Sequence, residues 1–180
     1  DIATLGITAN VGDFFIYSLG FDGLNASETS TATFNVILSD GTAPVTSTVT
    51  LTVDGVNDAP TVTVSPVTLS ETDFSTLSNL PNAYKIITEL EMFNIMGVDD
   101  VDLNDSLTLS LVTDSSNFTS TNSGIDNATS GVVQLTAADI ATLGITANVG
   151  DFFIYSTGFD GLNASELATV TFDVILSDGT

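Results

Sequence analysis

Aspartates crowd into one short stretch of the chain. Asp99, Asp100, Asp102 and Asp105 lie within seven consecutive positions, and no basic residue is near them in sequence. Calcium takes roughly six to eight hard oxygen ligands, which carboxylates and carbonyl groups supply. The pattern therefore predicts a calcium site, and the alternative is a solvated acidic loop of the kind that Asp-rich turns commonly form.

The same stretch fits an EF-hand calcium loop poorly. Asp100, Asp102 and Asn104 match the first, third and fifth loop positions. Asp105 then stands where the EF-hand needs Gly, and Leu111 stands where it needs Glu. The stretch is therefore not predicted to be an EF-hand loop.

Composition limits the classes of function. The 180 residues carry a net charge of −22, with Lys85 the single basic residue and no His or Cys. Nucleic acids and anionic membranes are bound through Lys and Arg, so we expect neither as a partner. The acidic excess favours divalent cations, a salty exterior, or both. Without His, Cys or a sugar-stacking Trp we expect no enzyme. No apolar run approaches the ~20 residues of a membrane-spanning helix.

A long stretch of the sequence occurs twice. Residues 1–42 recur at 139–180, and five of the 42 aligned positions differ: Leu19/Thr157, Thr29/Leu167, Ser30/Ala168, Ala32/Val170 and Asn35/Asp173. Near-identity over this length indicates a recent duplication, and so long a unit predicts an array of independent domains. We expect the natural protein to continue on both sides of this window.

Alternating apolar and polar residues predict strands. Residues 45–53 place Val45, Val49, Leu51 and Val53 on one face and Thr on the other, which is typical of a strand with one solvated face. Further strands are expected at 14–17, 32–38, 61–64, 107–111, 132–135, 152–155 and 170–176. Many short strands between Asp-Gly and Asn-rich turns predict an all-β protein, specifically a β-sandwich.

Two segments bear on helix formation. Residues 136–144 predict a short helix with Thr136 as N-cap, Asp139 as its capping-box partner and Gly144 as the stop. The apolar pattern of 83–97 fits both a helix and a strand, and the glutamates on either side of Leu90 favour a strand.

The segment 54–60 predicts a domain boundary. It connects two expected strands, and Pro60 biases the preceding residue to an extended backbone, which makes a stiff connector. Residues 1–56 would be the C-terminal part of one repeat, and 57–180 most of the next repeat without its last strand. Asp54 and Asp58 flank the connector, whose carbonyl groups are further candidate calcium ligands.

Four stretches together resemble one known family, the bacterial cadherin-like repeats of giant surface adhesins, of the VCBS and RTX-adhesin type. Residues 53–62 resemble the family's GVNDAP junction, and residues 100–108 resemble its DVD…D-LT segment. Residues 155–159, with Gly161 and Phe172, resemble its Y…GF-G…F stretch, and residues 177–180 resemble its SDGT turn. The resemblance runs over nearly the whole chain in the family's order. It implies a cadherin- or immunoglobulin-like Greek-key β-sandwich, repeated in tandem on a bacterial cell surface, with calcium at the domain junctions.

The resemblance also implies which residues bind calcium. Asn57, through its backbone carbonyl, and Asp58 would bind calcium together with the Asp-x-Asp pair of the following domain, Asp100 and Asp102. Glu71 resembles the Glu that serves the junction at the other end of its own domain. Asp54 stands one position too early for the family's upstream acid, and the Glu of the preceding domain is expected to lie before Asp1. With the acidic stretch itself, the predicted metal ligands are Asn57, Asp58, Asp100, Asp102, Glu71, Asp99, Asp105 and Asp54.

Three hypotheses of function follow. The first is a structural extender, in which calcium-stiffened junctions between neighbouring repeats hold an adhesive domain away from the cell. The second is a repeat that itself binds a glycan, a cell surface or a like chain; the few scattered differences between the copies favour the extender. The third is assembly by strand exchange, in which residues 43–53 of one chain complete the sandwich of another.

Overall fold

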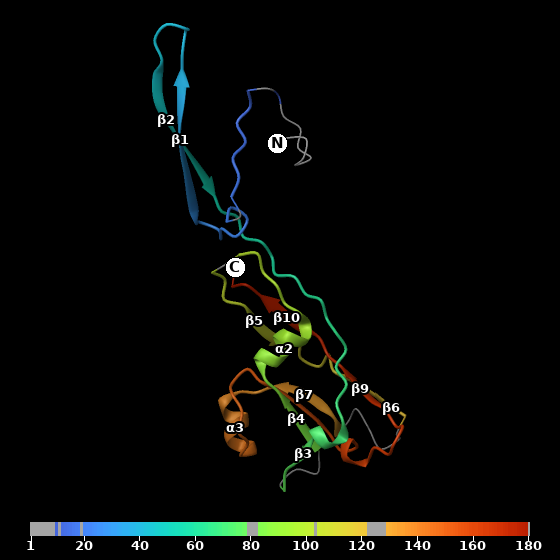
Figure 1. Cartoon of the computed structure of the whole chain (residues 1–180). Coiled ribbons are helices and arrows are strands. Elements are labelled where there is room, and N and C mark those ends of the chain that lie inside the picture. The colour runs from blue at the N-terminus through green and yellow to red at the C-terminus, as the bar shows by residue number, and fades with distance from the viewer. Residues whose placement is uncertain are drawn as a thin grey trace. The chain divides into compact units, whose positions relative to one another are not determined.

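The computed structural model describes residues 10, 12–18, 20–78, 83–102, 104–121 and 129–179. The regular secondary structure of this part of the chain consists mostly of strands in small antiparallel sheets, with two short α-helices (Figure 1). None of its helices is long and apolar enough to cross a membrane. The chain divides into two compact units: unit 1 is Asp1–Asp58 with Val101–Asn104, and unit 2 is Ala59–Asp100 with Asp105–Thr180.

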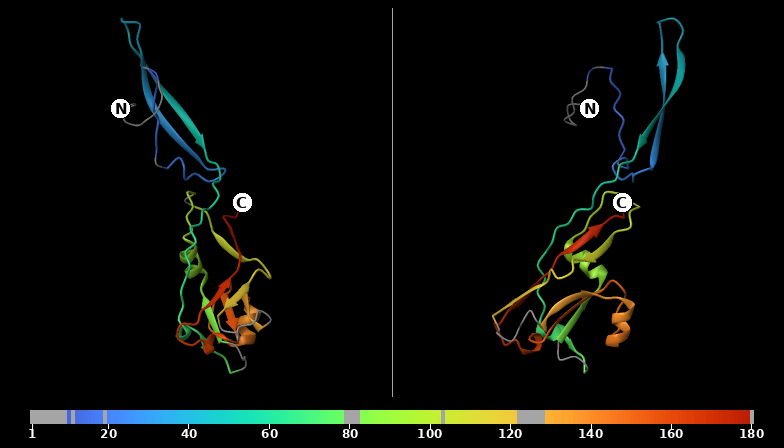
Figure 2. Two further views of the ribbon diagram at one scale, coloured as in Figure 1. Left: turned by 90° about the vertical axis from the view of Figure 1, so that its right-hand side faces the viewer. Right: turned by 180° about the vertical axis from the view of Figure 1, so that it is seen from behind.

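Unit 1 is built on one long hairpin, which Figure 2 shows as a twisted ribbon. β1 (Thr29–Leu38) pairs with β2 (Val45–Asp54) in a single unbroken register. The strand predicted at 45–53 is thus confirmed, but its apolar face is incompletely covered, because Val45 and Leu51 are 63% and 40% exposed. The strand expected at 14–17 does not form, and its side chains are exposed.

Unit 2 contains a four-stranded antiparallel sheet in the order β3-β4-β8-β7 and two strand pairs, β5 with β10 and β6 with β9. The strands are β3 (Ser75–Thr76), β4 (Ala83–Ile87), β5 (Thr108–Leu111), β6 (Asn117–Ser120), β7 (Gly131–Gln134), β8 (Phe152–Ser156), β9 (Ala168–Thr171) and β10 (Val174–Ser177). The strands expected at 107–111, 132–135 and 152–155 correspond to β5, β7 and β8. The strand predicted at 170–176 is divided into β9 and β10 by Phe172 and Asp173.

The hydrophobic core lies in unit 2. It joins side chains of the four-stranded sheet, among them Ile87, Phe152 and Ile154, to Leu109 of β5 and Phe118 of β6. The inward-facing residues of β9 and β10, together with the residue between these strands, pack against it: Ala168, Val170, Phe172, Val174 and Leu176. The alternation seen in the sequence therefore marks a real buried face in this unit.

The prediction for 83–97 was wrong in its second half. Residues 83–87 form β4, but α2 (Glu89–Met96) follows directly. Thr88 caps this helix: its side chain accepts from the Glu91 N–H, and the Glu91 carboxylate accepts from the Thr88 N–H at 2.8 Å. Gly97 ends the helix with φ 54°. These local cap interactions outweigh the strand-like pattern around Leu90.

α3 (Ala137–Leu143) confirms the predicted helix, with Thr136 as N-cap, Asp139 in the capping box and Gly144 in the left-handed conformation. Its first-copy equivalent lies outside the described residues. The strand expected at 61–64 is wrong beyond its first residue, because Thr61 forms an isolated bridge with Asp99 and no strand follows. Short 3-10 helices occur at η1 (Glu71–Asp73) and η3 (Phe159–Gly161).

Candidate metal centre

Three of the predicted aspartates form one cluster. Carboxylate oxygens of Asp100, Asp102 and Asp105 lie within 4.8 Å of one another. Calcium binds oxygen at about 2.3–2.6 Å, so two of its ligands are separated by at most about twice that length. The spacing of the cluster therefore fits ligands of a single ion. Three carboxylates this close also repel one another, and a divalent cation would offset most of their charge.

Asp102 connects the acidic loop to the linker. Its side chain is 4% exposed, and its Oδ2 accepts a hydrogen bond from the backbone N–H of Asp58 at 2.7 Å. Asp58 and Asp102 both belong to unit 1. The two residues are 44 positions apart, and this bond places the end of the linker beside the Asp-x-Asp pair.

Glu28 is a further acidic residue beside the loop, and the sequence analysis did not predict it. Its Oε1 accepts from the side-chain amide of Asn104 at 2.9 Å, and its Oε2 accepts from the Asn25 N–H at 3.0 Å. Its backbone carbonyl accepts from the Gly55 N–H at 2.8 Å. The Asn-x-x-Glu spacing could have drawn attention to it, since the second copy forms the same turn, with the Asn163 N–H donating to Glu166 at 2.6 Å.

Oxygen atoms withdrawn from solvent gather in these same segments. They come from the turn that Asn25 and Glu28 close, from the linker and from the acidic loop. They are carboxylate or amide oxygens, which hard cations bind. The buried atoms are Asn25 Oδ1, Asn57 Oδ1, Asp100 Oδ2, Asp102 Oδ1 and Asp105 Oδ2. Four of these five residues belong to the predicted set, and Asn25 does not.

The other predicted ligands lie outside the cluster. The side chains of Asp54, Asp58 and Asp99 are exposed. Asp99 instead contributes its backbone, which exchanges hydrogen bonds with Thr61 at 2.8 and 3.0 Å and fixes the start of the acidic loop. Glu71 lies in η1, which contacts η3, and stays a predicted ligand of the junction at the other end of the domain.

Gly55 of the linker packs closely against the turn that precedes β1. A Cβ at this position would lie 2.2 Å from the carbonyl oxygen of Asn25 and 2.5 Å from that of Leu24. We expect Gly55→Ala to displace the linker from Glu28 and to cost about 1–3 kcal/mol, because two backbone groups would have to move. Faster hydrogen exchange of the β1 and β2 amides would report this loss.

Gly161→Ala is the matched control for this change, since a Cβ there meets no atom within 4 Å. It should alter stability by less than about 0.5 kcal/mol. Equal exchange rates in the two variants would contradict the close packing of the linker.

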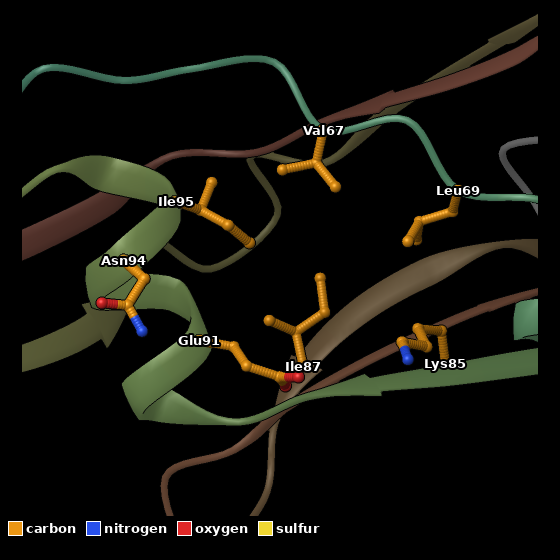
Figure 3. A pocket seen from close by; sticks show the side chains of 7 residues that line it. All are labelled: Val67, Leu69, Lys85, Ile87, Glu91, Asn94 and Ile95. Atoms are coloured by element: carbon orange, nitrogen blue, oxygen red, sulfur yellow. The ribbon is translucent and has the colours of Figure 1, made fainter.

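A separate hollow in unit 2 offers different chemistry (Figure 3). It is lined by side chains of the segment after the linker, of β4 and of α2: Val67, Leu69, Lys85, Ile87, Glu91, Asn94 and Ile95. Hydrogen bonds from Thr88 hold the pKa of Glu91 below its ordinary value, and the Lys85 ammonium acts in the same direction. Glu91 is therefore ionised at neutral pH and engaged in capping α2. The rest of the lining is mostly apolar, so the acidic loop remains the better metal site.

Comparisons with known proteins identify no relative of this chain. A scan of the chain against models of protein families finds no match, and searches of curated proteins and of solved structures return no significant match. The cluster of Asp100, Asp102 and Asp105 could bind a metal ion.

Proposed function

We propose that this chain is a structural extender segment of a bacterial surface adhesin or filament, built of cadherin-like β-sandwich repeats whose junctions are stiffened by calcium. The observation that carries the proposal is the hydrogen bond from the Asp58 N–H to the buried carboxylate of Asp102. Asp102 is also a member of the acidic cluster, which supports a role of the linker in metal binding. An ion bound by the cluster would hold the linker as well.

The chemistry of the ligands favours calcium over other metals. Carboxylate and amide oxygens suit hard cations, and the chain has no Cys or His to select zinc or copper. Asn25, Asn57 and Glu28 are the candidates to complete the coordination that the aspartates begin. Calcium tolerates the irregular, many-oxygen geometry of such a set better than magnesium, which demands a near-ideal octahedron.

The wider architecture supports an extender. The long repeated unit is expected in a tandem array, in which stiffness at each junction adds up along the chain. The core of unit 2 joins side chains of the four-stranded sheet to those of the β5–β10 and β6–β9 pairs, which supports the sandwich. A net charge of −22 suits an exterior that contains salt and calcium.

The proposal is tested by the distribution of distances between the two units. Spin labels are attached at Thr46→Cys in unit 1 and Ala141→Cys in unit 2, which are exposed positions in a chain that has no other Cys. Double electron–electron resonance should give a narrow distribution of distances between the labels with calcium and a broad one with chelator. Fixing a linker reduces the number of conformations, so narrowing is the direct sign of stiffening.

A matched pair of variants identifies the site. In the Asp102→Asn variant the distribution of distances between the labels should stay broad when calcium is added. In the Asp99→Asn variant, which changes an exposed residue of the same stretch, calcium should narrow this distribution as it does in the original sequence. Equal widths with calcium and with chelator would refute the extender mechanism. Calcium binding without narrowing would leave a metal site that does not stiffen the chain.

A further inference from the structure

The four-stranded sheet of unit 2 has two faces of different composition. Ile87 of β4, Phe152 of β8 and Val132 of β7 belong to the hydrophobic core on one face. Successive residues of a strand point to opposite faces, so the neighbours of these residues lie on the outer face. The register places the outer residues in two rows across β4, β8 and β7: Ile86, Phe153 and Val133 in one row, and Tyr84, Tyr155 and Gly131 in the other.

Aromatic rings cover the middle of this outer face. The rings of Tyr84 and Phe153 are stacked, with centroids 5.0 Å apart and planes inclined by 22°. The ring of Tyr155 lies on the other side of the same row, 5.8 Å from that of Phe153. Phe153 is 3% exposed, whereas Tyr84 and Tyr155 are half-buried. The two tyrosines therefore present part of their surface to solvent, with Phe153 packed against both.

Gly131 allows the side chain of Tyr155 to lie across β7. A Cβ at position 131 would be 2.5 Å from the Tyr155 hydroxyl oxygen and 2.7 and 2.9 Å from two of its ring carbons. Any larger residue at this position would displace the ring. A glycine inside a strand commonly marks such a close approach. The missing side chain of Gly131 thus helps to keep the aromatic surface low and broad.

Hydroxyl groups border the aromatic rings. Ser75 of β3 lies opposite Tyr84 and is exposed. Two residues beyond Tyr155, the hydroxyl groups of Thr157 and Thr129 share a hydrogen bond 3.0 Å long. The tyrosines add hydroxyl groups of their own. An apolar surface with a polar border is typical of sites that bind ligands.

We infer that the aromatic face of unit 2, formed by these two rows of residues, binds an uncharged carbohydrate. A pyranose ring has a face of C–H groups, which packs well on an aromatic ring, and hydroxyl groups at its edge, which need hydrogen-bond partners. Tyrosine supplies both kinds of contact and loses little conformational entropy on binding. The face carries no carboxylate, so it would bind a sugar and not cleave it.

The charge of the chain selects a neutral ligand. None of the side chains of the aromatic face is charged, although the whole chain carries a net charge of −22. The field of so acidic a chain repels nucleic acids and acidic glycans. A basic peptide would gain more from the acidic surface elsewhere on the chain than from uncharged rings. A neutral sugar meets no repulsion and matches the composition of this face.

The test is an NMR titration of the nitrogen-15-labelled full chain with neutral oligosaccharides. The probes are cellohexaose, chitohexaose and maltohexaose, because stacking does not by itself select one linkage. Chelator is present, so that the outcome does not depend on the proposed calcium site. We expect at least one probe to shift the amide signals of Tyr84, Gly131 and Tyr155 in a saturable way. The inference is overturned if these signals do not move with any of the probes at millimolar concentration.

Variants locate the site. Tyr84→Ala removes one ring of the aromatic face and should raise the dissociation constant roughly tenfold. Tyr84→Leu should show the same loss and keeps an apolar side chain, should the alanine variant fail to fold. Tyr17→Ala is the matched control, because Tyr17 occupies the position of Tyr155 in the first copy, is 79% exposed and lies in no sheet. It should leave the dissociation constant unchanged, and an equal loss in the control would contradict binding at this face.

Two other occupants of the face are distinguished by further measurements. Hexagalacturonate is the charged counterpart of the probes, and equally tight binding of this acidic sugar would refute the selection by charge. Sedimentation velocity examines self-association. A mass that rises with concentration above the 18.6 kDa of one chain, and that Tyr84→Ala returns to this value, would mean that a second copy covers the face. That result would also overturn the inference.

Discussion

Calcium is expected to raise the midpoint temperature of thermal unfolding of the full chain by roughly 5–10 °C when it is present at a hundredfold excess over its dissociation constant. An ion that binds only the folded state stabilises that state by about 2.7 kcal/mol at this excess. Each kcal/mol corresponds to about 2–4 °C in a chain of this size. Differential scanning calorimetry with calcium and with chelator measures the shift.

Asp102→Asn should remove most of this calcium-dependent shift. The amide keeps an oxygen that can accept from the Asp58 N–H, so the variant tests the charge of Asp102 more than its hydrogen bond. Asp99→Asn is the control, because Asp99 carries the same charge, lies in the same stretch and is exposed. If the original sequence shows no shift, the aspartates are a solvated loop and the acidic composition is explained by adaptation to salt. Equal loss of the shift in both variants would contradict the assignment of the site to the buried cluster and not to the exposed Asp99.

Phe152→Ala is expected to cost about 3–5 kcal/mol of folding free energy, the usual range for removing a buried aromatic ring. Phe152 is fully buried in the core of unit 2, where its ring also contacts that of Phe172, with centroids 6.0 Å apart. Urea unfolding followed by circular dichroism measures the loss. Part of it comes from the cavity that remains when the ring is removed.

Phe14→Ala is the matched control for this prediction, because Phe14 occupies the same position in the first copy of an identical sequence. Its side chain is 72% exposed, so its removal should change stability by less than about 0.5 kcal/mol. Equal costs at the two positions would mean that the first copy buries this ring in solution, and would contradict the exposed conformation of 14–17.

Helices were predictable where their caps were recognised. Thr136, Asp139 and Gly144 identified α3 because the groups of a capping box lie within one turn of each other. α2 has the same kind of box, formed by Thr88 and Glu91, but its hydrophobic pattern alone was ambiguous. Weighting the cap above the pattern would have identified both helices.

The candidate site was predictable only in part. Asp100, Asp102 and Asp105 are close in sequence, so their type and spacing were sufficient to indicate a metal site. Glu28 lies 76 positions from Asn104, which donates to it, and nothing local to either residue indicates this contact. The exposure of Asp99 and Asp54 also depends on how the chain packs, which the number of carboxylates in a stretch does not reveal.

The sequence by itself determined the turns, as the two copies demonstrate. The Asn10 N–H donates to Asp13 and the Asn148 N–H donates to Asp151, both at 2.8 Å. Ser27 and Ser165 take the same rare positive φ, 74° and 78°. Each of these turns is closed by hydrogen bonds between residues three positions apart, so it forms whatever surrounds it.

Only the tertiary structure decided which segments became strands. Residues 13–18 and 151–156 are identical, yet Phe152–Ser156 is a buried strand between β4 and β7, and Phe14–Tyr17 is exposed and forms no strand. A strand gains its hydrogen bonds and its apolar burial from segments that are distant in sequence. The same residues therefore adopt a different conformation wherever those partners differ.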